Sequence, residues 1–208
     1  MKSIKVTVDE VCGLTQAFNY MRLPHKEDID HKIIETDFST DMPLSKQLIK
    51  SGDDHAKHMR MIWIWMRVRA PRYWWQEMAT YSIGASYISE STMHTLVKLV
   101  RKNMSSRHNL YLAMKARISL TANVTVIENF CTSCIEIFEA EPNSISKQRL
   151  YLKAALPEAW LQTRGVNVNY QTLRRIYFAR RNHKLPEWQR FLSEVLDQIP
   201  YPELITEE

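Results

Sequence analysis

The sequence predicts an α+β fold in which a small antiparallel or mixed sheet packs with long helices. Three stretches, residues 4–8, 61–68 and 160–168, have the apolar pattern of short strands. Most of the remaining chain has the spacing of helices, and long helices separate the strands, unlike in a doubly wound sheet. With 208 residues, 45% of them hydrophobic, the chain suffices for a single domain spanning 1–208.

Local signals place the other elements. Residues 24–42 are polar and interrupted, which predicts a loop with one short element around Ile33. A helix at 44–51 is expected to end at Gly52, and Pro71 suits the start of a helix at 72–82 that ends near Gly84. Further helices are expected at 91–102, at 116–140 before Pro142, up to Ala155 after a cap at Ser144 or Ser146, at 169–182 and at 186–198.

The charge balance favours partners that carry phosphate. There are 28 Lys and Arg against 23 Asp and Glu, a formal net charge of +5, and the basic residues do not gather in one tail. A small anionic ligand is therefore favoured over DNA packaging. The N-terminus does not read as a signal peptide, no run of about 18 apolar residues predicts a membrane span, and three cysteines are typical of a reduced, cytoplasmic protein.

The last quarter of the chain contains the most informative helix. Asn169, Leu173, Ile176 and Arg180 are spaced so that they lie on nearly the same side of a helix. A polar and a cationic residue on an apolar stripe indicate a bound anion or polar ligand. The alternative is an arginine that extends from the end of a core helix into solvent.

Cysteine, histidine and serine patterns do not define a further site. Cys131 and Cys134 form a C-x-x-C pair in the middle of a predicted helix, and no second pair completes a zinc site, so a buried structural pair is expected and no metal. His55 and His58 are interpreted as loop histidines. The serines between 82 and 91 lie in no G-x-S-x-G elbow, so a hydrolase nucleophile is unsupported.

Charge and aromatic residues alternate after the second strand. Arg69, Arg72, Tyr73, Trp74 and Trp75 could stack bases and hold phosphates. The same residues could pack a wide apolar helix face against a sheet. Burial of both tryptophans distinguishes the two interpretations.

Several motifs, taken in order, resemble the flavin-dependent thymidylate synthases over about residues 51–188. They are Gly52 and His55 before the second strand, Arg69-Ala70-Pro71 and Gln76 after it, and then Leu156-Pro157, Asn169, Leu173, Arg180, His183 and Trp188. The stretch from Ala70 to Leu96 also resembles a divergent group of phage-encoded proteins.

The resemblance implies methylation at C5 of deoxyuridylate (dUMP), with carbon from methylene-tetrahydrofolate and hydride from reduced FAD. It also implies homotetramers whose sites form between subunits. Cofactor-binding residues are then expected at His55, Gln76, Asn169 and His183. Substrate-binding residues are expected at Glu90, Ser91, Lys153 and Arg180, with Lys153 for the nucleotide phosphate and Arg180 for the pyrimidine.

The chain departs from the family at its Arg-His-Arg-x-x-Ser signature. Residues 80–85 (TYSIGA) stand there, and Gln171 replaces a flavin-contacting arginine. No catalytic residue is therefore assigned. Three functions stay open: a FAD-dependent, dUMP-binding methyltransferase of this type, another one-carbon modification of a nucleotide, and a non-catalytic phage protein that binds a host protein or nucleic acid near Arg72.

Overall fold

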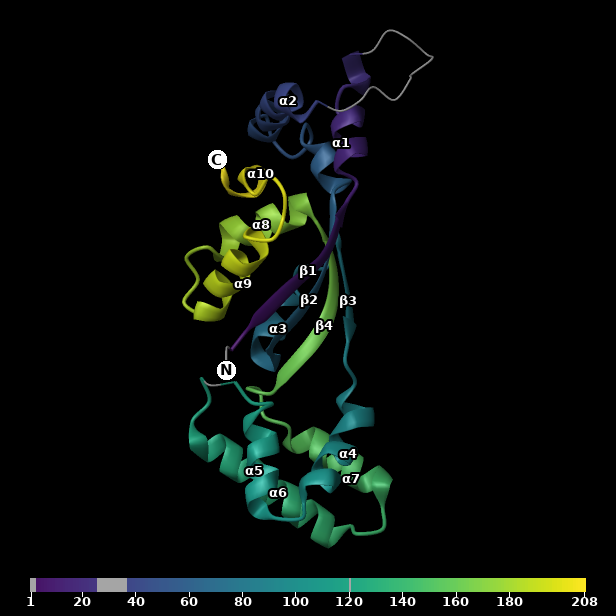
Figure 1. Ribbon diagram of the computed structural model, residues 1–208, viewed down its shortest axis with the longest axis vertical. Helices are drawn as coiled ribbons and strands as arrows, with labels where there is room; N and C mark the ends of the chain where they lie inside the picture. The colour runs from purple at the N-terminus through teal and green to yellow at the C-terminus, as the bar shows by residue number, and fades with distance from the viewer. Residues whose placement is uncertain (1–2, 26–36, 120) are drawn as a thin grey trace. The chain divides into compact units, whose positions relative to one another are not determined.

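The computed structural model describes residues 3–25, 37–119 and 121–208, and it confirms the α+β class (Figure 1). The strands are β1 (Lys5–Cys12), β2 (Trp63–Pro71), β3 (Ala85–Ser89) and β4 (Leu161–Asn169). The α-helices are α1 (Leu14–Tyr20), α2 (Phe38–Lys50), α3 (Arg72–Met78), α4 (Thr92–Asn103), α5 (Arg107–Lys115), α6 (Val124–Ala140), α7 (Ile145–Ala155), α8 (Tyr170–Arg180), α9 (Pro186–Leu196) and α10 (Glu203–Thr206). Two 3-10 helices, η1 (Leu23–His25) and η2 (Lys57–Arg60), complete them.

The four strands form one sheet in the order β1-β2-β4-β3. Beside β2 and β4, the Tyr170 amide donates to the Ile62 carbonyl, and the Arg72 amide donates to the Trp160 carbonyl. Residue numbers rise along one strand as they fall along the other, so this central pair is antiparallel. The sheet thus agrees with the prediction of a small antiparallel or mixed sheet.

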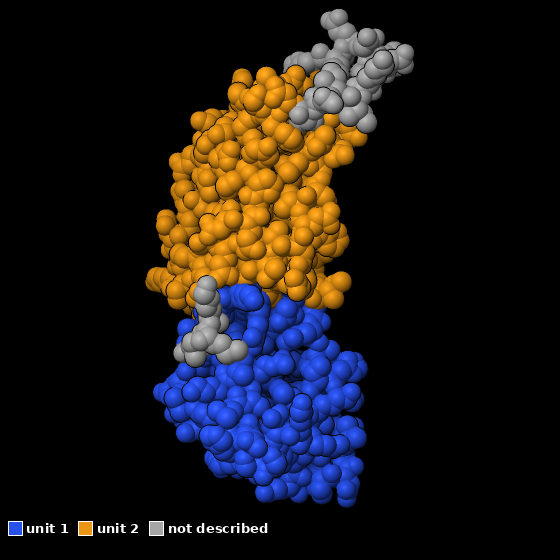
Figure 2. All heavy atoms as spheres, in the orientation of Figure 1, with its two compact units in different colours: residues 1–5, 69–78, 89–164 blue, residues 6–68, 79–88, 165–208 orange. Residues whose placement is uncertain are grey.

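The chain divides into two compact units (Figure 2). Unit 1 comprises residues 1–5, 69–78 and 89–164, and unit 2 comprises residues 6–68, 79–88 and 165–208. The core of unit 1 is a cluster of buried side chains from α4 to α7, with Val100, Met114, Phe130 and Leu152 each at most 2% exposed. Each unit therefore buries apolar side chains of its own.

Unit 2 is built on one face of its part of the sheet. Ile64, Met66 and Val68 alternate along β2 and are at most 2% exposed. Helices α8 and α9 lie on one side of this part of the sheet in Figure 1, and they bury Ile176 and Trp188. The period-2 pattern of β2 and the 3.6-residue pattern of α8 therefore supply the two sides of this core.

Most predicted elements are confirmed. β1, β2 and β4 overlap the three predicted strands, and α4, α7, α8 and α9 overlap the helices predicted for those regions. Ser144 is the cap of α7, since its hydroxyl accepts a bond from the Lys147 amide. Cys131 and Cys134 are buried in α6 as free thiols, and burial raises the pKa of Cys134 to about 12, which fits the expected structural pair.

Two helices were predicted with the wrong start. The loop expected at 24–42 is helical from Phe38, because the Asp37 carboxylate caps α2 at the Ser39 amide and the helix continues through Pro43. The element expected around Ile33 lies outside the described residues. The helix expected at 116–140 begins only at Val124, after the Asn123 cap.

The helix predicted at 72–82 ends at Met78, and β3 follows where no strand was expected. β3 lies at an edge of the sheet, and its residues are half-buried or exposed. An edge strand of this kind has no buried apolar alternation, so the sequence contains little signal for it.

No helix among the described residues is both long enough and apolar enough to cross a membrane.

His58 belongs to η2, and its buried ring contacts α2. Its Nε2 lies 2.7 Å from the Ser45 hydroxyl, and its residue surface is only 3% exposed. Burial lowers the pKa of His58 from 6.5 to about 4, because the charged imidazolium would lose its hydration. The folded protein therefore keeps this ring neutral at pH values where the unfolded chain protonates it.

Replacement of His58 by glutamine is expected to reduce the acid sensitivity of unfolding. The unfolded chain binds a proton near pH 6.5 and the folded chain only near pH 4, so wild-type stability falls as pH drops through this window. The loss attributable to this group is roughly 3 kcal/mol at most. Urea unfolding of both proteins at pH 7 and pH 4.5 measures it, and equal pH slopes would contradict the assignment.

Candidate functional site

Asn169 begins α8 and joins three segments of unit 2. Its side-chain oxygen accepts a bond from the Thr172 amide at 2.8 Å, and its own amide donates to the Gly84 carbonyl at 3.0 Å. The Thr172 hydroxyl donates to the Ile83 carbonyl at 2.9 Å. The first turn of α8 is therefore tied both to the end of β4 and to the turn before β3.

Gly84 allows that turn to lie close against α8. Its φ is +71°, and a Cβ at this position would lie 2.5 Å from the Thr172 hydroxyl oxygen and 2.6 Å from the Asn169 side-chain nitrogen. Only glycine fits both the backbone conformation and the space. Where the resemblance places two arginines, a histidine and a serine, this chain has a tight turn packed on a helix.

Arg180 lies at the other end of α8 against two aromatic rings. Its Nε donates to the Tyr81 hydroxyl at 2.9 Å, and its guanidinium carbon lies 4.9 Å from the Trp188 ring centroid and 5.6 Å from that of Tyr81. These are cation–π distances. Arg180 is thus half-buried on a defined surface rather than extended freely into solvent.

His183 lies beside the same tryptophan. Its ring centroid is 6.3 Å from that of Trp188, in an edge-to-face arrangement, and its Nδ1 accepts a bond from the Leu185 amide at 3.2 Å. Two of the expected ligand-binding residues, Arg180 and His183, are therefore brought together on Trp188. Asn169 belongs to the same helix as Arg180 but to its opposite end.

Gln171 is engaged by an arginine that the sequence did not single out. The Arg60 Nε donates to the Gln171 side-chain oxygen, and Gln171 is only 6% exposed. Because Gln171 stands where the resemblance expects a flavin-contacting arginine, Arg60 supplies a guanidinium next to that position from another part of unit 2.

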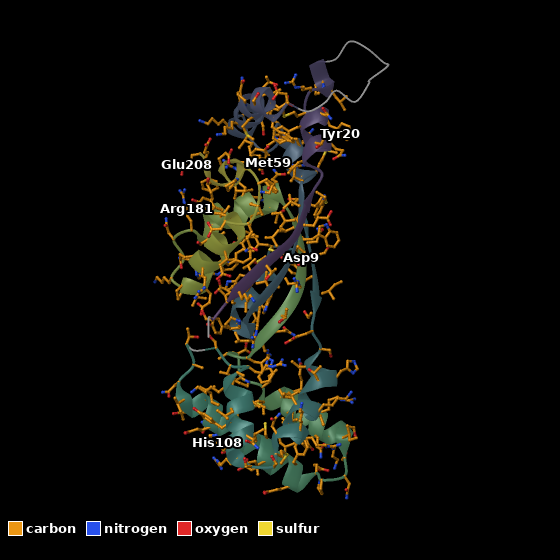
Figure 3. All side chains as sticks on the ribbon, viewed as in Figure 1. Asp9, Tyr20, Met59, His108, Arg181 and Glu208 are labelled. Atoms are coloured by element: carbon orange, nitrogen blue, oxygen red, sulfur yellow. The ribbon has the colours of Figure 1, made fainter. Side chains whose placement is uncertain are left out.

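His55 is exposed and lines a pocket of about 300 Å³ in unit 2. Tyr20 of α1, labelled in Figure 3, belongs to the same lining. Leu48 and Met61 make part of the wall apolar. The pocket combines apolar walls with polar groups, which is the usual composition of a small-molecule site.

In unit 1, Lys153 reaches the start of α4. Its Nζ donates to the Thr92 hydroxyl at 2.7 Å, and Thr92 is the first residue of the helix and 4% exposed. Burial, and then the nearby Arg72 charge, lower the pKa of Lys153. An anion that binds beside Lys153 would stabilise its charged, protonated form.

Glu90 and Ser91 precede the same helix. The Glu90 carbonyl accepts a bond from the Gln162 amide group at 3.0 Å, and its carboxylate lies 4.0 Å from the Arg117 guanidinium. The Ser91 side chain does not cap α4. Burial, followed by the charge of Arg117, lowers the pKa of Arg69, and the Glu90 carboxylate acts in the opposite direction.

The aromatic motif of α3 belongs to the core. Trp74 and Trp75 are at most 1% exposed, and the Trp75 indole donates to the Gln162 carbonyl at 2.9 Å. Gln76 is exposed and bonds to Glu158 at 3.0 Å. The surface near Arg72 therefore does not present these tryptophans, so they cannot stack bases there.

The expected residues fall into two sets. Unit 1 contains Gln76, Glu90, Ser91 and Lys153, and unit 2 contains His55, Asn169, Arg180 and His183. Sequence reasoning missed Thr92 and Arg60 and could not decide whether Ser82, Tyr81 or Tyr87 replaces the lost basic groups, because the contacts that define these positions join segments distant in the sequence.

No family model matches the sequence, and no curated protein matches it either. Comparison with solved structures shows that the fold is that of the flavin-dependent thymidylate synthases. ThyX of Helicobacter pylori, complexed with FAD and dUMP, matches with a TM-score of 0.71 and 20% identity over 100% of this chain and 99% of its own. A second structure of that protein with FAD and dUMP gives a TM-score of 0.73 and 19% identity, covering 98% of each chain.

The UMP/dUMP methylase PolB of Streptomyces cacaoi, bound with 5-Br dUMP, also matches. Its TM-score is 0.67 at 12% identity, over 99% of this chain and 95% of that one. Identities this low establish the shared fold alone.

Proposed function

We propose that the protein is a divergent, phage-type relative of the flavin-dependent thymidylate synthases. It binds a pyrimidine deoxynucleotide of the dUMP type in the cytoplasm and carries out C5 methylation or a related one-carbon modification. The observation that carries the proposal is the Lys153 ammonium on the Thr92 hydroxyl at the first turn of α4. The fold supports it, since the similar ThyX and PolB structures contain dUMP and 5-Br dUMP.

The phosphate is assigned to the start of α4. Amide groups at a helix N-terminus attract anions, and the Ser91 side chain does not cap this one. Lys153 adds a point charge, and Arg72 is close enough to lower the pKa of Lys153. A phosphate dianion bound here would relieve that repulsion. Glu90 and Ser91 are assigned to the same ligand.

The pyrimidine is assigned to Arg180 in unit 2. Its guanidinium is oriented by Tyr81 and Trp188, so little side-chain entropy remains to be lost on binding. His183 contacts the same tryptophan. No side chain is assigned as a nucleophile, and the free cysteines Cys131 and Cys134 are buried in α6.

Replacement of Lys153 by alanine is expected to weaken dUMP binding by roughly 10- to 100-fold, the range of a charge-assisted hydrogen bond. Affinity for deoxyuridine, which lacks the phosphate, is expected to stay unchanged. Titration calorimetry at fixed ionic strength measures both. Lys102→Ala, an exposed lysine at the end of α4, is the matched control.

Two results would contradict these assignments. Wild-type protein that binds no deoxynucleotide would remove the proposed function. If the Lys153→Ala protein binds dUMP as tightly as the Lys102→Ala control, the phosphate does not bind at the start of α4.

The polar groups of unit 2 fit a flavin. His55 lines the 300 Å³ pocket, and Arg60 brings a guanidinium to Gln171. Asn169 uses its side-chain oxygen for the cap of α8, which leaves its amide nitrogen as a donor. We assign FAD to His55, Asn169 and His183 of unit 2, and the resemblance alone assigns Gln76 to the cofactor. When bound, FAD supplies the hydride, and a methylene-folate supplies the carbon.

Purified protein is expected to release flavin fluorescence on denaturation, and FAD is expected in a mass-spectrometric search for co-purifying small molecules. His55→Ala should lower the flavin content because it removes a pocket-lining donor, whereas His94→Ala, on the exposed side of α4, should not. A colourless wild-type protein without flavin would contradict the cofactor and leave the nucleotide proposal standing.

We also propose that the protein is a homo-oligomer, as a tetramer of the family type, through the second face of the unit 2 sheet. Ile64 and Met66 are buried, so Trp65 and Arg67 point to the other face, where Trp65 is 51% exposed. Arg67 pairs with Asp9 of β1 at 2.7 Å. This face combines the apolar Trp65 ring with a positive and a negative side chain, Arg67 and Asp9. Such a surface suits a self-complementary contact with a second copy of the chain.

Trp65→Glu is expected to shift the protein to a smaller species in analytical ultracentrifugation, since it would bury a charge in the contact. Leu150→Glu, a substitution of an exposed leucine of α7, should leave the oligomer intact. A wild-type protein that is monomeric at all concentrations tested would overturn this proposal.

A further inference from the structure

The Tyr81 hydroxyl has one hydrogen that the described residues do not use. It accepts a bond from the Arg180 Nε at 2.9 Å. A phenol hydroxyl also donates, but among the described residues no acceptor for this hydrogen is found. Tyr81 is half-buried, and its ring lies edge-on to Trp188 at 6.2 Å. The hydroxyl is thus held in place while its hydrogen remains available to a ligand.

The position of Tyr81 is set by contacts on both sides of it. The Tyr87 hydroxyl donates to the Tyr81 carbonyl at 2.8 Å. Two residues further along, the Ile83 carbonyl accepts a bond from the Thr172 hydroxyl. The ring therefore projects from a segment that is tied to α8, and it reaches Arg180 in the last turn of that helix.

We propose that Tyr81 is a specificity-determining residue whose hydroxyl donates to the C4 carbonyl of the pyrimidine beside Arg180. The inference rests on the proposed nucleotide function. A guanidinium has only donors, and the Tyr81 hydroxyl, which already accepts from it, still has its own hydrogen to donate. Donation by a cation also strengthens the hydroxyl as a donor.

This pair of donors distinguishes uracil from cytosine. Uracil has a carbonyl oxygen at C4, which accepts hydrogen bonds, whereas cytosine has an amino group there. An amino group there cannot accept a hydrogen from Arg180 or from Tyr81, and a buried donor left without an acceptor is a strong source of discrimination. Tyr81 would then act in place of a basic signature residue that this chain lacks.

Titration calorimetry of wild-type protein with dUMP, dCMP and the 4-deoxy analogue of dUMP tests the inference without any substitution. Wild type is expected to bind dUMP about tenfold or more tightly than the analogue that lacks the C4 oxygen. Tyr81→Phe, which keeps the ring and removes the hydroxyl, is expected to lose about tenfold in dUMP affinity and less than about twofold in dCMP affinity. Tyr151→Phe, on α7, is the matched control.

The outcomes separate the possible failures. If wild type binds no nucleotide, the proposed function and this inference fail together. If wild type binds dUMP but does not distinguish it from the 4-deoxy analogue, only this inference fails. Equal losses of dUMP and dCMP affinity in Tyr81→Phe would also overturn it, because Tyr81 would then only position Arg180. Thermal unfolding of each variant confirms that the fold is kept.

Discussion

The first turn of α8 is the constraint on which the described arrangement of unit 2 depends. At this point the end of β4, the Gly84 turn and the helix share three hydrogen bonds, two of them made by Asn169 and one by the Thr172 hydroxyl. Burial of these polar groups makes each bond costly to leave unmade. Because α8 is rigid and eleven residues long, fixing its start also fixes where Arg180 stands at its end.

The electrostatics of the two units supports the proposed anionic ligand. In unit 1 the pKa values of Lys153 and Arg69 are lowered, first by burial and then by a neighbouring cation. In both cases the neighbouring cation, Arg72 or Arg117, opposes the charged form of the side chain. A bound phosphate would offset this effect. In unit 2 the Arg180 guanidinium lies against the Trp188 and Tyr81 rings, and these contacts orient it.

Where the chain departs from the resemblance, other polar groups lie nearby in space. The tight turn at Gly84 replaces several basic groups, yet Tyr81 on the same segment contacts Arg180. Gln171 replaces an arginine, yet Arg60 lies against it. Shared fold with altered polar groups is a common route to altered specificity. Such changes move affinity and selectivity more readily than they move the architecture.

Local sequence signals determined most of the architecture. Strong period-2 or 3.6-residue patterns placed β2, β4, α8 and α9, and Asn169 and Ser144 are caps that act within one helical turn. The same local logic missed β3, because an exposed edge strand buries no alternating face. The prediction also included residues 116–123 in α6, because their apolar content resembles that of a helix. The helix in fact begins after the Asn123 cap.

Tertiary structure alone decided which chemical groups meet. Tyr81 with Arg180, Thr92 with Lys153, and Arg60 with Gln171 are separated by 99, 61 and 111 residues. The sequence named one member of each of these pairs, but it contained no periodic signal for the partners. It could not decide between a core and a surface role for Trp74 and Trp75 either. The reason is physical: propensity and periodicity act over one or two turns, whereas contacts between distant segments depend on how the whole chain packs.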